Sequence, residues 1–313
     1  MIVHNGTKGI EHKRRVVVLG NFDGIHIGHQ NLIKQGIELA KEKNAVLTIF
    51  TFYPQWQALN KADFKYLLSQ SDKMNMLEKI GVDEVITQAC DADFSSITAH
   101  AFIQDILVDV LNVCGVVVGF NYSFGYKAEG TPELLNDVLT PQGITVHIEP
   151  PFQYADNIVS SSLIRRQVRA GNMLLVRELL GYSYHLCGEV VHGAQNGRKM
   201  NFPTANIDYD ESLMLPSLGV YAAKAWLVDE PDKKYNGVLN IGTRPTVDDS
   251  EKITVEIHML DFEQQIYGKQ LCIEVHHFLR HISKFKNLSE LKLTISMDVV
   301  NAKKFFEKES YVH

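Results

Sequence analysis

The stretch VVVLGNFDGIHIGH, residues 16–29, decides the fold of the first half of the chain. Its β-branched run, residues 16–19, predicts a buried strand, and the glycine-bearing segment that follows predicts a loop. Residues 30–43 then have the apolar spacing and the charge of an amphipathic helix. A strand that leads through a glycine loop into a helix is typical of open α/β sheets, which bind ligands beyond the carboxyl ends of their strands.

The same alternation continues to residue 150. Apolar runs predict strands, and amphipathic segments between them predict helices. The expected strands are 45–52, 83–89, 114–120 and 144–150, and the expected helices are 71–81, 98–112 and 131–139. Strands that alternate with helices predict a doubly wound parallel sheet with helices on both faces.

After residue 181 the pattern changes to short strands and turns. Strands are expected at 185–193, 219–228, 235–242, 252–260 and 270–279, and only the tail, 288–308, has helical spacing. This pattern predicts a small antiparallel β-barrel with a closing helix. We therefore expect an α/β protein of two domains, with the parallel sheet in residues 1–183 and the barrel in residues 184–313.

The composition limits the kinds of partner. The chain has 313 residues, 45% of them hydrophobic, and a net charge of -6, which argues against the broad basic surface that nucleic acid requires. No apolar run approaches the roughly 20 residues that cross a bilayer, and the N-terminal residues lack the apolar core of a signal peptide. We therefore expect a cytoplasmic protein that binds neither nucleic acid nor membrane.

The four cysteines are far apart in the sequence and form no Cys-x-x-Cys pair. This spacing argues against a zinc knuckle and against a disulfide framework. We expect them to be small buried residues in a reducing compartment. They are Cys90, Cys114, Cys187 and Cys272.

The glycine loop carries a candidate phosphate site. Gly20 and Gly24 permit a tight turn, and Gly28 lets a phosphate approach the start of the following helix, whose N–H groups favour anions. His26 and His29 are three residues apart, so both can donate hydrogen bonds to one α-phosphate under attack. The alternative is an ordinary turn with two solvent-exposed histidines. The coincidence of strand, glycine loop, paired histidines and helix favours the nucleotide site.

Residues 20–29 resemble the Gly-x-Phe-Asp-Gly-x-His-x-Gly-His segment of the His-x-Gly-His nucleotidyltransferases. The similarity is closest to the FMN adenylyltransferase domain of bacterial bifunctional riboflavin kinase/FAD synthetases, and every specified position matches, including Phe22 and Asp23. The resemblance implies that the loop binds ATP or flavin, that FMN and ATP are substrates, and that His26 and His29 are catalytic.

Two later segments are similar to the same family. In residues 117–130 the resemblance implies that Asn121 contacts the nucleotide or flavin, whereas the alternative is a strand that ends in a glycine turn. Residues 160–165 resemble the family's Ser-Ser-Thr-x-Ile-Arg, and the alternative is an ordinary helix cap. The residues implied here are Ser160, Ser161 and Ser162 for binding, and Arg165 for the β- and γ-phosphates that leave as pyrophosphate.

The segment HGAQNGRKMNFPTANI, residues 192–207, resembles the glycine loop and the Phe-Pro-Thr-Ala-Asn motif of riboflavin kinase domains. Without the resemblance, FPTAN is a proline turn. The resemblance implies Mg²⁺ ligands and ATP- or flavin-binding residues. The metal ligands are Thr204 and Asn206, and the binding residues are Gly193, Gly197, Arg198 and Pro203.

Glu256 lies on the strand expected at 252–260, on the same face as His258. The similarity to riboflavin kinases extends over nearly all of residues 185–308. It implies that Glu256 is the base that takes the proton from the ribityl 5′-hydroxyl of riboflavin. The alternative is a strand glutamate that faces solvent.

The chain departs from the family's usual residues at three places. Gln55 replaces a histidine after the second strand, Met200 and Asn201 replace Leu-Gly, and His281-Ile282 stand where acidic residues are usual. Three hypotheses therefore follow: an enzyme with both activities, a paralogue that keeps one of them, and a flavin-binding regulatory protein without turnover. We favour the first, because the residues implied in catalysis are retained in both halves.

Overall fold

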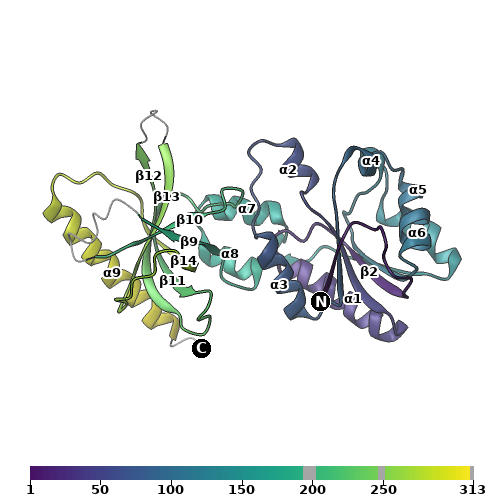
Figure 1. Ribbon diagram of the computed structural model, residues 1–313, viewed down its shortest axis with the longest axis horizontal. Coiled ribbons are helices and arrows are strands. Elements are labelled where there is room, and N and C mark those ends of the chain that lie inside the picture. Colours follow the sequence, from purple (N-terminus) through teal and green to yellow (C-terminus); the bar gives the residue numbers. More distant parts are fainter. Residues whose placement is uncertain (193–201, 246–250, 311–313) are drawn as a thin grey trace. The chain divides into compact units, whose positions relative to one another are not determined.

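The computed structural model describes residues 1–192, 202–245 and 251–310 (Figure 1). The chain forms two compact units, residues 1–161 and 162–313. This division falls before the predicted domain boundary at 183/184, which stays a prediction. Among the described residues, no helix is both long and apolar enough to cross a membrane.

The first unit is built on a six-stranded parallel sheet with the strand order β1-β4-β3-β2-β5-β6. Its strands are β1 (Ile2–Asn5), β2 (Arg15–Leu19), β3 (Val46–Phe52), β4 (Glu84–Gln88), β5 (Val113–Gly119) and β6 (Thr145–Glu149). The predicted parallel sheet is therefore confirmed. The edge strand β1 was not expected, because its residues are mostly exposed and do not alternate between apolar and polar.

Helices and short segments connect these strands. They are α1 (Ile27–Lys43), α2 (Trp56–Asn60), α3 (Gln70–Ile80), α4 (Ala92–Ser95), α5 (Ala99–Ala101), η1 (Phe102–Val110), η2 (Tyr126–Ala128), α6 (Pro132–Leu139), η3 (Thr140–Gln142), and the hairpin β7 (Gln153–Tyr154) and β8 (Asn157–Ile158). Ser69 caps α3, and Gly81 ends it with a left-handed φ of 98°. The single helix expected at 98–112 is instead α5 continued by the π-helix η1.

Helices cover both faces of the sheet, as predicted (Figure 1). Successive residues of a strand point to opposite faces. Val16 and Val18 of β2 therefore share a core with α1 and α3. Val17 and Leu19 of the same strand share the other core with η1 and α6.

The histidine loop leaves the sheet at its switch point. From β2 the chain runs to β3 and β4, and it later returns to β5, which borders β2 on the other side. The loop after Leu19 thus starts between two neighbours that belong to opposite halves of the sheet. In open α/β sheets this crevice is where ligands bind.

The second unit contains a closed antiparallel barrel with the strand order β10-β13-β12-β11-β14-β9. Its strands are β9 (His185–Val191), β10 (Ala205–Tyr209), β11 (Gly219–Leu227), β12 (Tyr235–Pro245), β13 (Glu251–Met259) and β14 (Gln270–Arg280). The predicted barrel is confirmed, but β10 was not expected, because it starts inside the segment interpreted as a proline turn.

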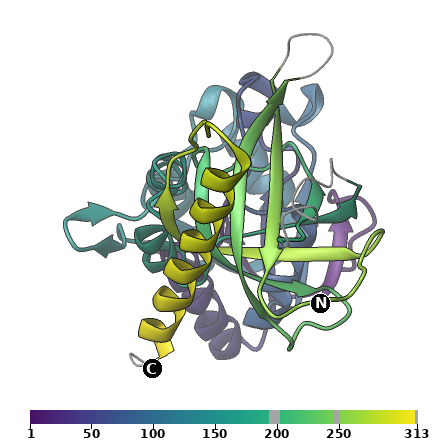
Figure 2. The ribbon, with the colours of Figure 1, turned by 90° about the vertical axis from the view of Figure 1, so that its left-hand side faces the viewer.

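Three helices accompany the barrel: α7 (Ser161–Arg169), α8 (Met173–Leu180) and α9 (Leu288–Ser310). The helix α9 is the predicted closing helix, and Figure 2 shows it along the outside of the strands. Its Ala302 and Phe306 share a core with Val220 and Val238 of β11 and β12. Arg177 of α8 also pairs with Glu309 of α9, which links α8 to this unit.

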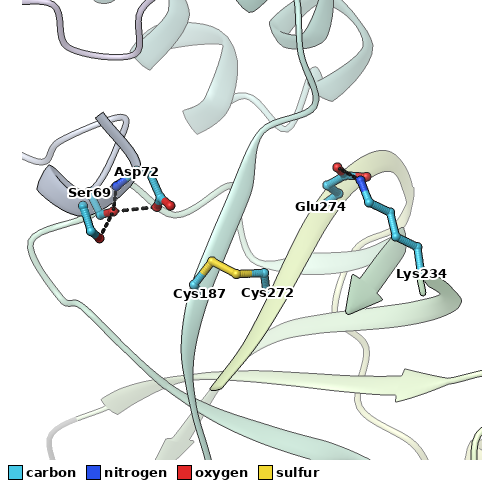
Figure 3. Close-up of a disulfide and its surroundings, with 7 residues drawn as sticks. Ser69, Asp72, Cys187, Lys234, Cys272 and Glu274 are labelled. Atoms are coloured by element: carbon cyan, nitrogen blue, oxygen red, sulfur yellow. Dashed lines mark hydrogen bonds and ion pairs between the residues drawn. A yellow bond between two sulfur atoms is a disulfide. The ribbon is translucent and has the colours of Figure 1, made fainter. Parts of the chain in front are cut away.

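Two of the four cysteines form a disulfide, so the expectation of unpaired buried cysteines was wrong for these two. Cys187 and Cys272 are 85 residues apart in sequence but lie directly opposite each other on β9 and β14 (Figure 3). Sequence spacing alone does not show that two strands are neighbours. The thiols of Cys90 and Cys114 are free, and both residues are half-buried.

Candidate active sites

The two loop histidines form one stacked pair in the first unit. Their ring centroids are 3.6 Å apart with an interplanar angle of 13°. His26 caps α1, and its Nδ1 accepts the backbone N–H of His29 at 3.2 Å. Since Nδ1 is an acceptor, the neutral His26 ring carries its proton on Nε2. The structure therefore brings together the two residues expected to act on one phosphate.

Both histidines are neutral at physiological pH. Burial lowers the pKa of His26 from the ordinary 6.5 to about 4. Burial, and then electrostatic coupling to His26 and Lys73, lower the pKa of His29 well below 6.5. The pair can therefore donate hydrogen bonds to a phosphate as neutral imidazoles, but it does not bring positive charge.

The glycines of the loop make room for its own side chains. Gly24 has a left-handed φ of 81° and provides the predicted turn. A Cβ on Gly20 would lie 3.0 Å from the ring of Phe22, and one on Gly28 would lie 3.3 Å from the ring of His26. Phe22 itself adopts a φ of 51°, which is uncommon for a residue with a side chain. The roles of these glycines toward a phosphate stay predictions.

Phe22 and Asp23 support the loop from its buried side. Their exposed fractions are 0% and 2%. The Asp23 carboxylate accepts the backbone N–H of Leu67 at 3.0 Å, and the Asp23 carbonyl oxygen accepts the hydroxyl of Ser161 at 2.9 Å. These contacts fix the loop, and the predicted ligand contacts of both residues stay predictions.

One carbonyl oxygen, that of Asn21, accepts three side-chain donors. These are Thr51 Oγ1 at 3.1 Å, Gln55 Nε2 at 3.2 Å and Lys73 Nζ at 3.1 Å. Gln55 is 2% exposed, so the residue that departs from the family is used to hold the loop. Thr51 and Lys73 were not among the site residues predicted from the sequence. The signal for Lys73 was its position four residues before Leu77, on the buried face of α3.

The other residues predicted to act together with the histidine loop are spread over both units. Asn121 is exposed just beyond the end of β5, the strand that borders β2. Ser160 is half-buried and precedes α7, which begins at Ser161 as expected. Ser162 and Arg165 belong to the second unit, so their roles toward the histidine loop stay predictions.

The second polar cluster lies across three strands of the barrel. Asn206 of β10 is directly opposite Glu256 of β13, and Asn240 of β12 is opposite the same glutamate from the other side. The strand neighbours Val255 and Ile257 are buried, whereas Glu256 is half-buried. Glu256 therefore lies on the face of the strand that points away from the barrel interior.

His258 connects this strand to the Phe-Pro-Thr segment. Its Nδ1 lies 2.8 Å from the carbonyl oxygen of Pro203 and, since a carbonyl only accepts, Nδ1 carries the proton. The ring of Phe202 packs edge-on against His258 at 5.4 Å. Thr204 follows directly, half-buried and two residues before Asn206, and Pro203 is exposed.

The hydroxyl of Thr204 and the amide oxygen of Asn206, beside the Glu256 carboxylate, are a donor set that suits Mg²⁺.

The predicted residues Gly193, Gly197 and Arg198 lie outside the described residues, as do Met200 and Asn201. His258 was predicted to share a face with Glu256, but its contact with the Phe-Pro-Thr segment was not predicted from the sequence.

Known proteins match the chain over both units. A family profile described as FAD synthetase matches residues 9–163, and one described as riboflavin kinase matches residues 180–306. A bifunctional riboflavin kinase/FMN adenylyltransferase from Listeria monocytogenes is 34% identical over 94% of this chain and 93% of its own length. The chain belongs to the bifunctional riboflavin kinase/FMN adenylyltransferase family.

Another family member and a solved structure are similar to the chain over nearly its full length. The bifunctional riboflavin kinase/FMN adenylyltransferase of Bacillus subtilis is 33% identical over 95% of this chain and 94% of its own length. A crystal structure described as a macrolide-efflux protein from Streptococcus pneumoniae has a TM-score of 0.87 and 27% identity, and covers 96% of this chain and 98% of that one. This chain shares the fold of that protein.

Proposed function

We propose that this member of the bifunctional riboflavin kinase/FMN adenylyltransferase family phosphorylates riboflavin to FMN and then adenylylates FMN to FAD, with ATP as the donor in both reactions. The observation that carries the proposal is that each of the two family matches corresponds to one compact unit with its own polar cluster. The stacked histidines suit the transfer of an adenylyl group, and the carboxylate beside Asn206 suits the transfer of a phosphoryl group.

In the kinase reaction, Glu256 takes the proton of the ribityl 5′-hydroxyl. The 5′-oxygen then forms a bond to the γ-phosphorus of ATP, the bond from that phosphorus to the bridging oxygen breaks, and ADP leaves. Thr204 and Asn206 would hold Mg²⁺, which neutralises phosphate charge when it is bound. The adjacent strands β10 and β13 keep Asn206 next to Glu256, so the proposed base and one proposed metal ligand are fixed by the same register.

In the adenylylation reaction, a phosphate oxygen of FMN forms a bond to the α-phosphorus of ATP, and the bond to the β-phosphate oxygen breaks to release pyrophosphate. The neutral rings of His26 and His29 donate hydrogen bonds to the α-phosphate as its negative charge grows. Arg165 receives the leaving pyrophosphate. Asn121 and the serines at 160–162 bind the nucleotide or flavin.

We further propose that the protein works in the cytoplasm, where ATP is available. A reducing compartment would keep the Cys187–Cys272 pair as two thiols. Acid quenching of growing cells, alkylation of the unfolded protein in denaturant and mass measurement test this: four alkylated cysteines support the cytoplasm, and two contradict it.

Chromatography of the flavin products tests the function. Purified full-length protein is incubated with Mg-ATP and either riboflavin or FMN, and the expected products are FMN and FAD from riboflavin, and FAD from FMN. FMN without FAD would leave only the kinase, and FAD from FMN alone would leave only the adenylyltransferase. No product from either substrate would favour the flavin-binding regulatory protein.

A further inference from the structure

Lys73 is a buried cation that the proposed reactions do not use. Helix α3 turns Lys73 and Leu77 to its buried face, and Lys73 is 1% exposed. Removing an ammonium group from water costs several kcal/mol unless nearby groups compensate for it. A methionine would fill similar space without this cost, so the charge at this position needs an explanation.

The hydrogen bond of Lys73 does not explain its charge. Its Nζ donates to the carbonyl oxygen of Asn21, which also accepts Thr51 Oγ1 and Gln55 Nε2. A carbonyl oxygen has two lone pairs, and the two neutral donors already satisfy them. The ammonium therefore adds positive charge to a site whose hydrogen bonding is complete without it.

The charge of Lys73 faces the loop that carries the histidines. Its Nζ contacts the loop at the Asn21 carbonyl oxygen, and the titratable groups coupled to its charge are the Asp23 carboxylate of the loop and the His29 imidazole of α1. Burial lowers the pKa of Lys73 to about 8, with Asp23 acting in the opposite direction, so the side chain is still charged at neutral pH. The two histidines are neutral under the same conditions.

We propose that Lys73 is a positioning residue for adenylyl transfer, whose buried ammonium fixes the histidine loop through Asn21 and supplies positive charge to the loop that carries the two histidines. The inference rests on the proposed adenylyltransferase function. Charge in a buried site is weakly screened, so it stabilises the negative charge that develops on the α-phosphate without touching it.

Four variants of the full-length chain separate charge from hydrogen bonding. Lys73→Met removes the charge and Lys73→Arg keeps it, while Thr51→Val and Gln55→Leu each remove one neutral donor to the same Asn21 oxygen. We expect Lys73→Met to lower kcat for FAD formation about 100-fold, with a much smaller change in KM. Thr51→Val and Gln55→Leu should each lower kcat for FAD formation by less than about tenfold. Lys73→Arg should keep most of the wild-type kcat. FMN formation by the same proteins should be unchanged.

The proposal is overturned if Lys73→Met loses no more kcat than Gln55→Leu. If Lys73→Met does not fold, the pH profile of the wild-type protein decides instead. FAD formation should fall as the pH rises through about 8, because Lys73 loses its proton there, whereas FMN formation should not fall. A flat profile for FAD formation across this range would contradict the charge role. Wild-type protein that makes no FAD at any pH would overturn the proposed adenylyltransferase function itself.

Discussion

Asn206 of β10 lies directly opposite Glu256 of β13, in the register that joins the Phe-Pro-Thr segment to the barrel. Directly opposite residues of antiparallel strands point to the same face and have Cβ atoms about 5 Å apart. At this separation the carboxylate can act on the attacking hydroxyl while the amide oxygen holds the metal ion in the same phosphoryl transfer. The pairing therefore ties the proposed base to the proposed metal site through backbone geometry.

Glu256→Gln should lower FMN formation by about a thousandfold, because the amide cannot take the proton of the 5′-hydroxyl. FAD formation from supplied FMN should be unchanged. Both rates are measured on the same purified protein by chromatography of the flavins. Glu189→Gln is the matched control, since Glu189 is an exposed glutamate on β9 of the same barrel. Equal losses in the two variants would contradict the role of Glu256.

Asn206→Ala should raise the Mg²⁺ concentration needed for half-maximal FMN formation by at least about tenfold, because one oxygen ligand is lost. Saturating Mg²⁺ should restore part of the rate. The measurement is a Mg²⁺ titration of FMN formation, with FAD formation from FMN by the same protein as the reference. An unchanged Mg²⁺ requirement would remove Asn206 from the metal site.

His29→Ala should lower FAD formation about 100-fold and leave FMN formation unchanged, because one donor to the α-phosphate is lost.

The depressed pKa values of the two histidines predict the shape of the pH profile of FAD formation. Since His26 titrates at about 4 and His29 also far below 6.5, neither should produce an acid limb near pH 6.5 in the wild-type rate of FAD formation. A loss of activity centred near pH 6.5 that disappears in His26→Asn would contradict the neutral pair.

Acid should destabilise the first unit through His26. Its pKa is about 4 in the folded state and 6.5 in the ordinary one, so the unfolded chain binds the proton first. The contribution of His26 to the free energy of unfolding is therefore fully present above pH 6.5. About 3 kcal/mol of it is lost as the pH falls toward 4. His26→Asn keeps a helix-capping side chain but cannot titrate, and it should lose less stability over this range. Urea unfolding of both proteins at several pH values measures the difference.

The disulfide should stabilise the barrel in the oxidised protein. Cys187 and Cys272 close a loop with a sequence separation of 85 residues. Restricting such a loop in the unfolded chain contributes up to about 4 kcal/mol. Oxidised wild-type protein should therefore resist urea more than reduced wild-type protein, and the double variant Cys187→Ala/Cys272→Ala should behave like the reduced form. Identical unfolding of oxidised and reduced protein would contradict this expectation.

The sequence predicted what depends on local pattern. The apolar run of residues 16–19 and the helical spacing of residues 71–81 and 131–139 are read within a few residues, and the structure confirms the elements that they imply. The strand β10 was hidden, because its burial comes from the barrel partners on both sides and not from its own composition.

Contacts between distant segments were not predictable in this way. The Cys187–Cys272 bond depends on which strands are neighbours, and the three donors to Asn21 come from three separate segments. Both depend on tertiary packing. Gln55 stands where the family usually has a histidine, and the structure shows that its amide donates to the Asn21 carbonyl oxygen of the loop.

The two sheets differ in how they can associate with another chain. Within the described residues, the barrel of the second unit closes on itself and leaves no strand edge for pairing, whereas the sheet of the first unit ends at β1 and β6. Ile2 and Val3 of β1 are 51% and 46% exposed, so an apolar edge is open there. Unprotected edges of this kind are where chains add to one another. Self-association at high concentration is thus expected to begin at β1, and a charged side chain placed at Val3 should suppress it.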